Sequence, residues 1–479
     1  MGSFVHNLWP FILVLGAMIV IHEFGHFIVA KFFGIRVDIF SVGFGKRLFG
    51  FKKGDTDYRV SLIPLGGYVK MSGENLDEAR TGAPYEFMSK PKWQRFCVAV
   101  AGPAMNILTA LAIPAVLSMI HYEFPAYRTQ TPVVSAVAAG FPADAAGIQR
   151  GDVVLSIDGQ STPTWRDVED AIAINPGRDV QVSLRRGSEA KQVQMHIGTV
   201  VVGSEKIGEA GLVPYPGPNA RVIARSVTSG WPAEEAGLKA KDEIIKVNGK
   251  PVELGTDPSD AHGPSQGALY SVLDVVHTIE SSEGRPVTLT VLRGSETVDV
   301  TATPRLDGGK ARIGFGVGII GQDIVVTKLG APAAFKYSVE ENGRVIQLTK
   351  GVLAQVFAGQ RSARDTITGP VGIFEIVGQA AEEGATPVFQ MMGLLSLNLG
   401  IFNLLPIPVL DGGLIFMLAL EALLGLFGLP LTLRVKERMM QVGMVMLMLL
   451  MGFVIFNDIS KSFFRSSNSQ PTQAEQPKK

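Results

Sequence analysis

Cysteine and net charge are the two features that this sequence most clearly lacks. The 479 residues include one cysteine, Cys97. A single thiol can form neither an internal disulfide nor a cysteine-based zinc site. The 44 Lys and Arg residues balance the 44 Asp and Glu residues, so the basic excess of a nucleic-acid-binding protein is missing. A metal site must therefore use histidines and carboxylates, and no nucleic acid is expected as a partner.

Charged residues are scarce, at 18% of the chain, whereas hydrophobic residues make up 46%. The mean hydropathy is +0.24. In a long chain this composition indicates that some segments are solvated by lipid. The length is also about three times that of an ordinary domain. We therefore expect a membrane protein built from several units.

Four long apolar segments are predicted to cross the membrane, at residues 8–33, 96–120, 389–429 and 437–457. The first is not typical of a signal peptide, because residues 1–8 contain no Lys or Arg and no A-x-A pattern follows. The third is longer than one span requires and is interrupted by two prolines and by Asp411-Gly412-Gly413. We expect it to be one helix that is broken where protein or a water-filled cavity satisfies the freed backbone.

The basic residues predict the orientation of these spans. Residues 31–95 carry twelve Lys and Arg against seven Asp and Glu, and the turn before the last span contains Arg434, Lys436 and Arg438. Positively charged loops stay in the cytoplasm, which places both of these loops on the cytoplasmic side. Both termini and the long stretch up to residue 387 then lie outside the cytoplasm.

The extracytoplasmic stretch contains an internal repeat at an offset of 90 residues. Residues 137–159 match residues 227–249, with eight identical positions. Each copy predicts a short helix opened by Pro-Ala, a turn at an aspartate, and a strand, at Val153–Ile157 and Glu243–Val247, that ends in an Asp-Gly or Asn-Gly hairpin.

The repeat is similar to the bacterial form of the PDZ domain, with later strands expected at residues 181–185 and 287–292. Two α+β PDZ-like domains are thus expected at residues 127–202 and 219–306, and a generic small α+β module is the alternative. PDZ-like domains bind extended chain ends by adding a strand, so peptide or protein partners are expected. Residues 208–212 and 313–318 are weak candidates for loops that bind a chain-terminal carboxylate.

The first span contains His22-Glu23-Phe24-Gly25-His26, an H-E-x-x-H motif on a helix. Positions i and i+4 lie on one helix face, so both imidazoles can reach one zinc ion while Glu23 is angled toward a zinc-bound water. The alternative is a polar helix face that pairs with its neighbours. Each ionisable group in a span costs about 3 kcal/mol, so three such groups on one turn favour a functional site.

Asp411 is the candidate for a third zinc ligand, because catalytic zinc typically has three protein ligands and one open position. It lies in the interruption of the third span. Counted from the outer ends of their spans, His22, His26 and Asp411 lie 14, 18 and 22 residues deep. At about 1.5 Å per helical residue, all three fall toward the cytoplasmic half of the membrane. An ordinary turn aspartate is the alternative.

Six motifs follow one another along nearly the whole chain. They are His22 to His26, Gly43-Phe-Gly45, Ile63-Pro-Leu-Gly-Gly-Tyr-Val-Lys-Met71, Gly102-Pro-Ala-Met-Asn106, the tandem repeat, and Asn403-Leu-Leu-Pro-Ile-Pro-Val-Leu-Asp-Gly-Gly413. Together they resemble the site-2 protease family of intramembrane zinc metalloproteases. One departure is Leu414, where several relatives have histidine, but this position is not among the family's zinc ligands.

The resemblance implies a zinc metalloendopeptidase in which His22, His26 and Asp411 bind Zn2+ and Glu23 is the catalytic proton acceptor. It implies substrate contacts by Asn403 and by four glycines of a membrane-associated β-structure, within residues 34–95, that pairs with an unwound substrate: Gly43, Gly45, Gly66 and Gly67. The implied substrates are single-span membrane proteins, such as an anti-sigma factor already trimmed of its outer domain. Their cleavage would be regulated intramembrane proteolysis in a stress response at the bacterial inner membrane.

Local roles stay open for several of these residues. Asn403 could satisfy carbonyls freed by the prolines that follow it. Residues 36–42 and 58–69 have strand-like composition and could form an ordinary cytoplasmic hairpin around Gly43-Phe-Gly45. Helix packing explains Gly102-Pro103 and Asn106 equally well.

We therefore expect a polytopic α-helical membrane protein with four transmembrane helices, a membrane-associated β-structure and two extracytoplasmic PDZ-like domains that act as a filter for trimmed substrates. Residues 307–388 would be an extracytoplasmic connector and residues 458–479 a disordered tail. A non-catalytic PDZ scaffold and a zinc carrier are the alternatives. A scaffold has no need of Glu23 beside a histidine pair, and a carrier would need ligands along a path, whereas the sequence shows one cluster.

Overall fold

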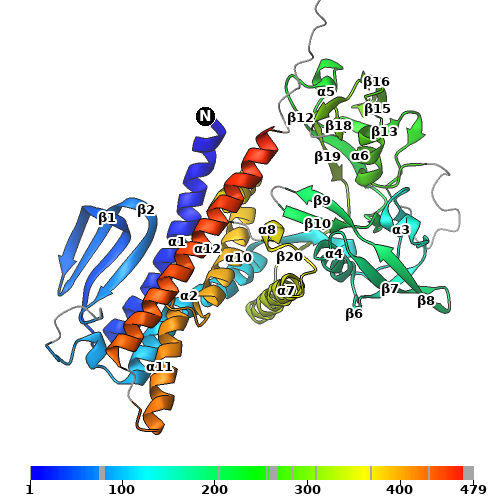
Figure 1. Cartoon of the computed structure of the whole chain (residues 1–479). Helices are drawn as coiled ribbons and strands as arrows, with labels where there is room; N and C mark the ends of the chain where they lie inside the picture. The colour runs from blue at the N-terminus through cyan, green and yellow to red at the C-terminus, as the bar shows by residue number, and fades with distance from the viewer. Residues whose placement is uncertain are drawn as a thin grey trace, which may run out of the picture. The chain divides into compact units, whose positions relative to one another are not determined.

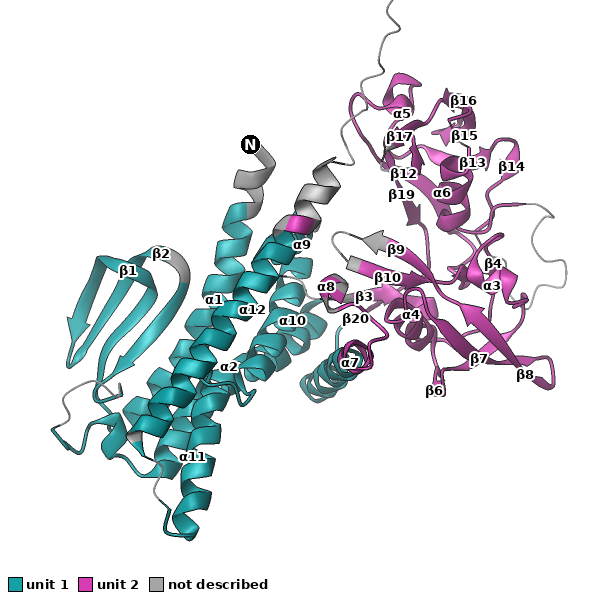
Figure 2. Cartoon of the chain, viewed as in Figure 1, with its two compact units in different colours: residues 1–121, 328–350, 367–459 teal, residues 122–327, 351–366, 460–479 magenta. Residues whose placement is uncertain are grey.

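The computed structural model describes residues 2–74, 81–202, 205–254, 257, 268–282, 284–307, 310–366, 369–429 and 432–467. The chain forms two compact units, each assembled from separate stretches (Figure 2). Unit 1 contains residues 1–121, 328–350 and 367–459, and unit 2 contains residues 122–327, 351–366 and 460–479.

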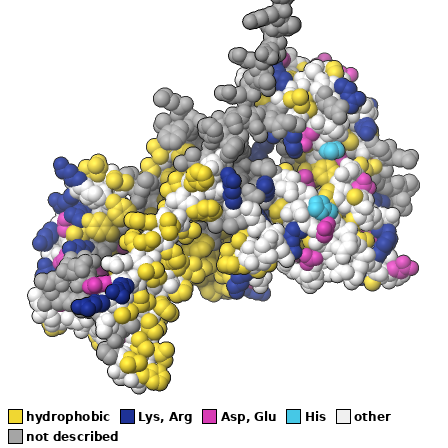
Figure 3. All heavy atoms as spheres, in the orientation of Figure 1, with side chains coloured by type: hydrophobic (Ala, Val, Ile, Leu, Met, Phe, Trp, Pro, Cys, Tyr) yellow, Lys and Arg dark blue, Asp and Glu magenta, His cyan; other side chains and the backbone are white. Residues whose placement is uncertain are grey.

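Long apolar helices make up most of unit 1 (Figure 1). They are α1 (Gly2–Phe32), α2 (Lys92–Ile120), α10 (Ala385–Asn403), α11 (Asp411–Leu426) and α12 (Leu433–Ser467). Four candidate membrane spans, at Leu8–Phe32, Lys92–Ile120, Ala385–Asn403 and Arg434–Asp458, are long and apolar enough to cross a membrane. The prediction of four apolar helices of membrane-spanning length is thereby confirmed. Hydrophobic side chains cover the visible face of this helical part, as expected for a surface that contacts lipid (Figure 3).

Helix α2 is the platform on which α1, α10 and α11 pack. It contains Pro114, which has no backbone N–H and therefore leaves the carbonyl of Ala110 without its helical donor. The buried side chain of Asn342, on α7 (Ala331–Phe357), donates to that carbonyl at 3.0 Å. A proline in a predicted span is thus compensated by a polar residue from a distant segment.

The predicted connector, residues 307–388, contains helices that the sequence analysis did not identify. They are α7, the short α8 (Ala363–Thr366) and α9 (Pro370–Glu383). Helix α9 packs against α1, where Phe11 and Phe374 meet edge to face with ring centroids 5.5 Å apart. The predicted tail also needs correction. Helix α12 continues to Ser467, so part of the segment expected to be disordered is helical, and residues 468–479 lie outside the described residues.

Two long strands, β1 (Val37–Lys53) and β2 (Thr56–Met71), form the sheet of unit 1. Both predicted strands are confirmed, but β1 does not stop at Gly43-Phe-Gly45 and continues through it. Gly43 adopts a φ of +91°, and a Cβ there would lie 2.7 Å from the carbonyl oxygen of Ile63, so the strand bends where only glycine fits.

The register shows which part of this sheet is central. Residues 39–42 of β1 pair with residues 67–70 of β2 on one side and with residues 57–60 of β2 on the other. Within the described residues, no strand pairs with the outer side of residues 67–71. This last segment of β2 is therefore an open edge.

Unit 2 contains two copies of one element order. The first copy contains β4 (Ala136–Val137), α3 (Pro142–Ala145), β5 (Val153–Ile157), β6 (Gln160–Ser161), α4 (Trp165–Ala173), β7 (Asp179–Arg186), β8 (Glu189–His196), β9 (Gly198–Val202), β10 (Glu205–Glu209) and β11 (Leu212–Val213). The second copy contains β12 (Arg221–Val227), α5 (Pro232–Glu235), β13 (Glu243–Val247), β14 (Lys250–Pro251), α6 (Val272–Glu280), β15 (Val287–Arg293), β16 (Glu296–Ala302), β17 (Arg305–Asp307), β18 (Lys310–Arg312) and β19 (Phe315–Ile320).

The strands predicted at Val153–Ile157 and Glu243–Val247 are confirmed as β5 and β13, and the later predicted strands lie within β7 and β15. The sheet order β6-β5-β7-β8 of the first copy is repeated as β14-β13-β15-β16 in the second. A ribbon of β3 (Tyr122–Pro125) and β20 (Ile324–Thr327) joins the two ends of the stretch that contains both copies.

The aspartate of each predicted turn forms a buried ion pair that the sequence analysis missed. Asp242 is 2% exposed, and the Arg293 guanidinium donates to both of its carboxylate oxygens, at 2.8 and 2.7 Å. Arg293 also donates to the carbonyl of Gly237 at 2.8 Å, so it fastens β15 to the preceding turn. Asp152 and Arg186 form the same arrangement in the first copy.

We expect Asp242→Asn to lower the free energy of unfolding of the second copy at pH 7, because the Arg293 guanidinium loses its charge partner. The hydrogen bonds from Arg293 hold the pKa of Asp242 below its ordinary 3.8. A carboxyl whose pKa is depressed in the folded state contributes stability above its unfolded pKa, and that contribution is lost as pH falls through the folded pKa.

The loss of unfolding free energy in the variant, relative to wild type, should thus be complete above about pH 5 and become smaller below about pH 4. Hydrogen exchange at the amides of β13 and β15 in the full chain measures this difference. An equal deficit at pH 3 and pH 7 would contradict the assignment.

Candidate active site

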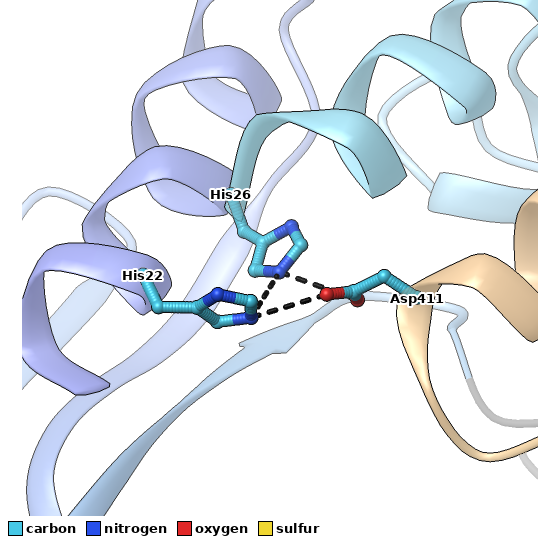
Figure 4. A group of neighbouring side chains, drawn as sticks. All are labelled: His22, His26 and Asp411. Carbon is cyan, nitrogen blue, oxygen red and sulfur yellow. Dashed lines mark hydrogen bonds and ion pairs between the residues drawn. The ribbon is translucent and has the colours of Figure 1, made fainter. Parts of the chain in front are cut away.

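The two histidines of H-E-x-x-H lie on one face of α1 and point toward the start of α11 (Figure 4). Both are buried, and their Nε2 atoms are 3.2 Å apart. Asp411 presents one carboxylate oxygen to each ring, at 3.1 Å from Nε2 of His22 and 3.4 Å from Nε2 of His26. Among the described residues, these three side chains form the one group of metal-ligating type that is close enough to share an ion.

The three side chains are close enough to share one zinc ion. Ligand atoms about 2.0–2.1 Å from zinc at tetrahedral angles lie about 3.3–3.4 Å apart. The two Nε2 atoms are 3.2 Å apart, and the distances of 3.1 and 3.4 Å run from them to the two different oxygens of Asp411, so one of these oxygens has to turn between the rings to become the third ligand. Two imidazoles and one carboxylate are also a donor set that catalytic zinc sites use, with the fourth position left for water.

The backbone of α2 fixes the tautomer of His26. Its Nδ1–H donates to the carbonyl of Val98 at 2.7 Å, which leaves the lone pair of Nε2 directed at the site. A Cβ on Gly102 would collide with both imidazole rings, so α2 can lie this close to α1 only because position 102 is glycine.

Asn106 lies beside the ring of His22; the sequence left it open whether this residue belongs to a family motif or only to helix packing. It is fully buried, and its amide lies 3.2 Å from Nδ1 of His22, while Oδ1 has no hydrogen-bond partner. With the amide turned so that Oδ1 faces the ring, Asn106 accepts the Nδ1 proton and leaves Nε2 free for metal. Two signals in the sequence pointed to Asn106: its place in the Gly102-Pro-Ala-Met-Asn106 motif, and its polar side chain inside an apolar span.

A compact loop positions Asp411. Helix α10 ends at Asn403 and α11 begins at Asp411, so the broken third span has its break directly before the carboxylate. A Cβ on Gly412 or Gly413 would collide with the backbone of the loop, at Leu405 and at Ile407. The two glycines therefore allow the loop to fold against the first turn of α11, which brings Asp411 to the histidines.

Glu23 lies one residue along α1 from His22 and is held by the sheet. The backbone N–H of Val69 donates to its Oε2 at 3.1 Å. Its charge interacts with His26, His22 and Asp411, so it belongs to the same electrostatic cluster. The open edge of β2 is thus joined directly to the candidate proton acceptor.

The predicted substrate-binding glycines are divided between two parts of the sheet. A Cβ on Gly67 would lie 3.6 Å from Cγ of Glu23, so this glycine is beside the cluster. Gly66 packs against the ring of Phe44. Gly43 and Gly45 both have positive φ and lie near Ile63, where β1 bends.

Asn403 is the last residue of α10 and is half-buried, immediately before the loop that leads to Asp411. Its predicted contact with substrate stays a prediction, as do those of the four glycines.

A cavity of about 650 Å³ opens beside Asp411. Its wall includes the ionisable side chains of Glu74, Arg95, Glu421 and Lys436, together with apolar residues of α11 and α12. Lys436 donates to Glu421 at 2.5 Å, which ties α12 to α11 at this cavity. A polar cavity gives water a place next to the candidate metal ligands.

Comparison with known proteins identifies the family of this chain. Residues 10–450 match the family model of peptidase family M50. The "Regulator of sigma-E protease RseP" of Escherichia coli (strain K12) is 32% identical over 480 residues, covering 96% of this chain and all of that protein. A relative from Neisseria meningitidis that is named as a zinc metalloprotease is 31% identical over 474 residues, covering 95% of this chain and 99% of that protein.

The resemblance to the site-2 protease family, and within it to the bacterial regulator of sigma-E protease, is thereby confirmed. Among solved structures, a PDZ domain of an SdrC-like protein from Listeria monocytogenes covers 18% of this chain and 87% of that chain, with 18% identity. Its TM-score of 0.16 is too low to bear on the fold.

We expect His22→Ala, His26→Ala and Asp411→Ala each to abolish stoichiometric zinc in the purified protein, because each removes one of three ligands. Asn106→Ala should weaken zinc affinity about 10- to 100-fold, since the ring of His22 loses the partner that orients it. Glu23→Gln should keep full zinc. Competition with a fluorescent chelator measures all five affinities.

Asn342→Ala is the matched control, because it also removes a buried asparagine that bonds to α2 but lies away from the histidines. It should bind zinc like wild type. Full zinc occupancy in the Asp411 variant would remove this carboxylate from the ligand set.

Proposed function

The chain belongs to peptidase family M50, the site-2 protease family, and from this premise we propose that it is an intramembrane zinc endopeptidase that cleaves transmembrane segments of single-span proteins. The proposal depends on one observation: His22, His26 and Asp411 lie close enough together to share a metal ion. They lie in and beside candidate membrane spans, and Glu23 is next to them. Bacterial inner membrane location follows from the relatives and from the four apolar helices.

The ligand set suits peptide hydrolysis. A zinc ion bound by these three side chains would polarise the scissile carbonyl and lower the pKa of a water in the open position. Glu23 is placed to accept a proton from the attacking water and to return it to the departing amine. Val98 and Asn106 hold the imidazoles in place before substrate arrives, and the Val69 N–H holds Glu23 beside them at the edge of β2.

Hydrolysis inside a membrane also requires an unwound substrate, because a transmembrane helix shields its amides by internal hydrogen bonds. The open edge at residues 67–71 of β2 can accept an extended segment as an added strand next to Glu23. Asn403 would contact the substrate near the metal. The predicted substrate is an anti-sigma factor, and the similarity of this chain to a regulator of sigma-E protease supports that prediction.

The two copies of unit 2 suit a filter outside the cytoplasm. Their matching element order and the shared ion pair support the PDZ-like interpretation of both. Each copy continues beyond the end predicted for it, to Val213 instead of residue 202 and to Ile320 instead of residue 306. The basic excess of residues 31–95 supports a cytoplasmic position for that loop. It thereby favours an active site toward the cytoplasmic side and a PDZ-like pair on the other side of the membrane. Such a pair would exclude substrates that still carry a bulky outer domain.

The proteolytic proposal is tested by co-expression with candidate single-span proteins. Glu23→Gln should slow cleavage at least about 100-fold, because the proton acceptor is lost while the metal ligands remain. Immunoblotting detects the shortened substrate. Glu123→Gln, which changes a glutamate of β3 in unit 2, is the control and should cleave like wild type. Equal cleavage by wild type and Glu23→Gln would contradict the role of Glu23.

Deletion of residues 129–320, which contain both copies, distinguishes a filter from a domain pair that recruits substrates. A filter predicts that the deleted enzyme keeps its zinc and now cleaves substrates with an intact outer domain. A recruiter predicts slower cleavage of trimmed substrates, because the effective concentration falls when the tether is lost. We expect the filter result, and loss of both cleavages in a deletion that still inserts and binds zinc would contradict it.

A further inference from the structure

The open edge of β2 has outward-pointing amides that are already engaged by carboxylates. Along a strand, the N–H groups alternate in direction, so Val69 and Met71 point to the same side. The Val69 N–H donates to Oε2 of Glu23 at 3.1 Å, and the Met71 N–H donates to Oε2 of Glu74 at 3.2 Å. By the same alternation, the N–H groups of Tyr68 and Lys70 point toward β1, the strand with which this part of β2 is paired.

An unpaired row of strand amides is a template for any extended chain that reaches it. Here two side chains from different segments occupy it. Glu23 comes from α1, whereas Glu74 comes from the turn that follows β2. Both occupy the donors to which the carbonyls of an added antiparallel strand would bind.

We propose that Glu23 and Glu74 cap the edge of β2 in the substrate-free enzyme, and that an extended peptide segment displaces both carboxylates when its carbonyls bind the Val69 and Met71 amides. This inference rests on the proposed function. The partner is an unwound segment of any sequence that can present two carbonyls on one side, because the donors are backbone groups.

The displacement links binding to chemistry. When the substrate takes the Val69 N–H, the Glu23 carboxylate is released from the edge on which the substrate now lies and can turn toward the metal cluster. Glu23 lies directly beside this edge, because a Cβ on Gly67 would be 3.6 Å from Cγ of Glu23. The proton acceptor therefore becomes available only where a peptide is in place.

The carboxylate that caps Met71 lies on the wall of a cavity that also contains a metal ligand. Glu74 and Asp411 both line the cavity of about 650 Å³. A segment that replaces Glu74 at Met71 would therefore extend along the wall of the cavity that contains the third metal ligand. The two caps mark the two ends of one peptide track.

Glu74 provides the test, because it lies outside the metal cluster. The full-length enzyme in detergent is assayed with a purified single-span substrate. Glu74→Ala should lower KM about fivefold and leave kcat unchanged, because the substrate no longer competes with a carboxylate for the Met71 N–H. Glu74→Gln is the matched control, since its amide oxygen still accepts that N–H, and its KM should stay near the wild-type value.

Val69→Pro tests the donor instead of the competitor. It removes the outward N–H but keeps the ladder to β1, a position where an edge strand tolerates proline. It should raise KM about fivefold, opposite in sign to Glu74→Ala. If Glu74→Ala does not fold, the Val69→Pro result decides. Equal KM in wild type and Val69→Pro, or equal KM in wild type, Glu74→Ala and Glu74→Gln, overturns the proposal.

Binding separates this inference from the proposed function. Fluorescence anisotropy of the labelled single-span protein is measured on Glu23→Gln and on Glu23→Gln with Glu74→Ala, neither of which needs to cleave. The second variant should bind about fivefold more tightly. If wild type cleaves no substrate but this difference is present, the proposed function fails and the cap stands. If wild type cleaves and the two affinities are equal, the cap alone fails.

Discussion

The cost of placing ionisable groups in an apolar helix governs much of this structure. Two imidazoles and two carboxylates lie in or beside candidate membrane spans, where each would be expensive without a partner. The chain compensates by assigning a polar contact to each one: Val98 and Asn106 to the imidazoles, the Val69 amide to Glu23, and both histidines to Asp411. The contacts to the imidazoles also orient these rings for metal binding.

The same constraint explains why distant segments meet on α2. A proline or a close helix crossing frees backbone groups that lipid cannot satisfy. Asn342 reaches the carbonyl freed by Pro114, and Ser396 donates to the carbonyl of Asn106 at 2.9 Å. Small residues such as Gly102 and Gly400 allow the helices to approach closely enough for these bonds. The packing that supports the site is therefore the packing that makes a broken, polar membrane helix tolerable.

Helical periodicity and apolar length can be read from the sequence, so the four spans and the helix face that carries His22 and His26 could be predicted. Asp411 could be predicted as a ligand because a carboxylate in a broken span is costly unless it binds a cation or a polar partner. The groups that hold the site residues could not be predicted, because Val98 and Val69 act through backbone atoms, which every residue type has. Arg186 and Arg293 were missed for a related reason: they lie on later strands, and only the folded sheet brings them to the turn aspartates. The extension of β1 beyond Gly43 depends on its pairing with β2, which no local pattern specifies.

The central claim is that His22, His26 and Asp411 hold one zinc ion in an open coordination sphere. X-ray absorption at the zinc edge, on the full-length protein in detergent, tests it most directly. The account predicts four-coordinate zinc with two imidazole nitrogens at about 2.0–2.1 Å, the remaining ligands being oxygens at about 2.0–2.2 Å. A sulfur ligand at about 2.3 Å, which Cys97 would have to supply, or a sphere with fewer than two imidazoles, would contradict it.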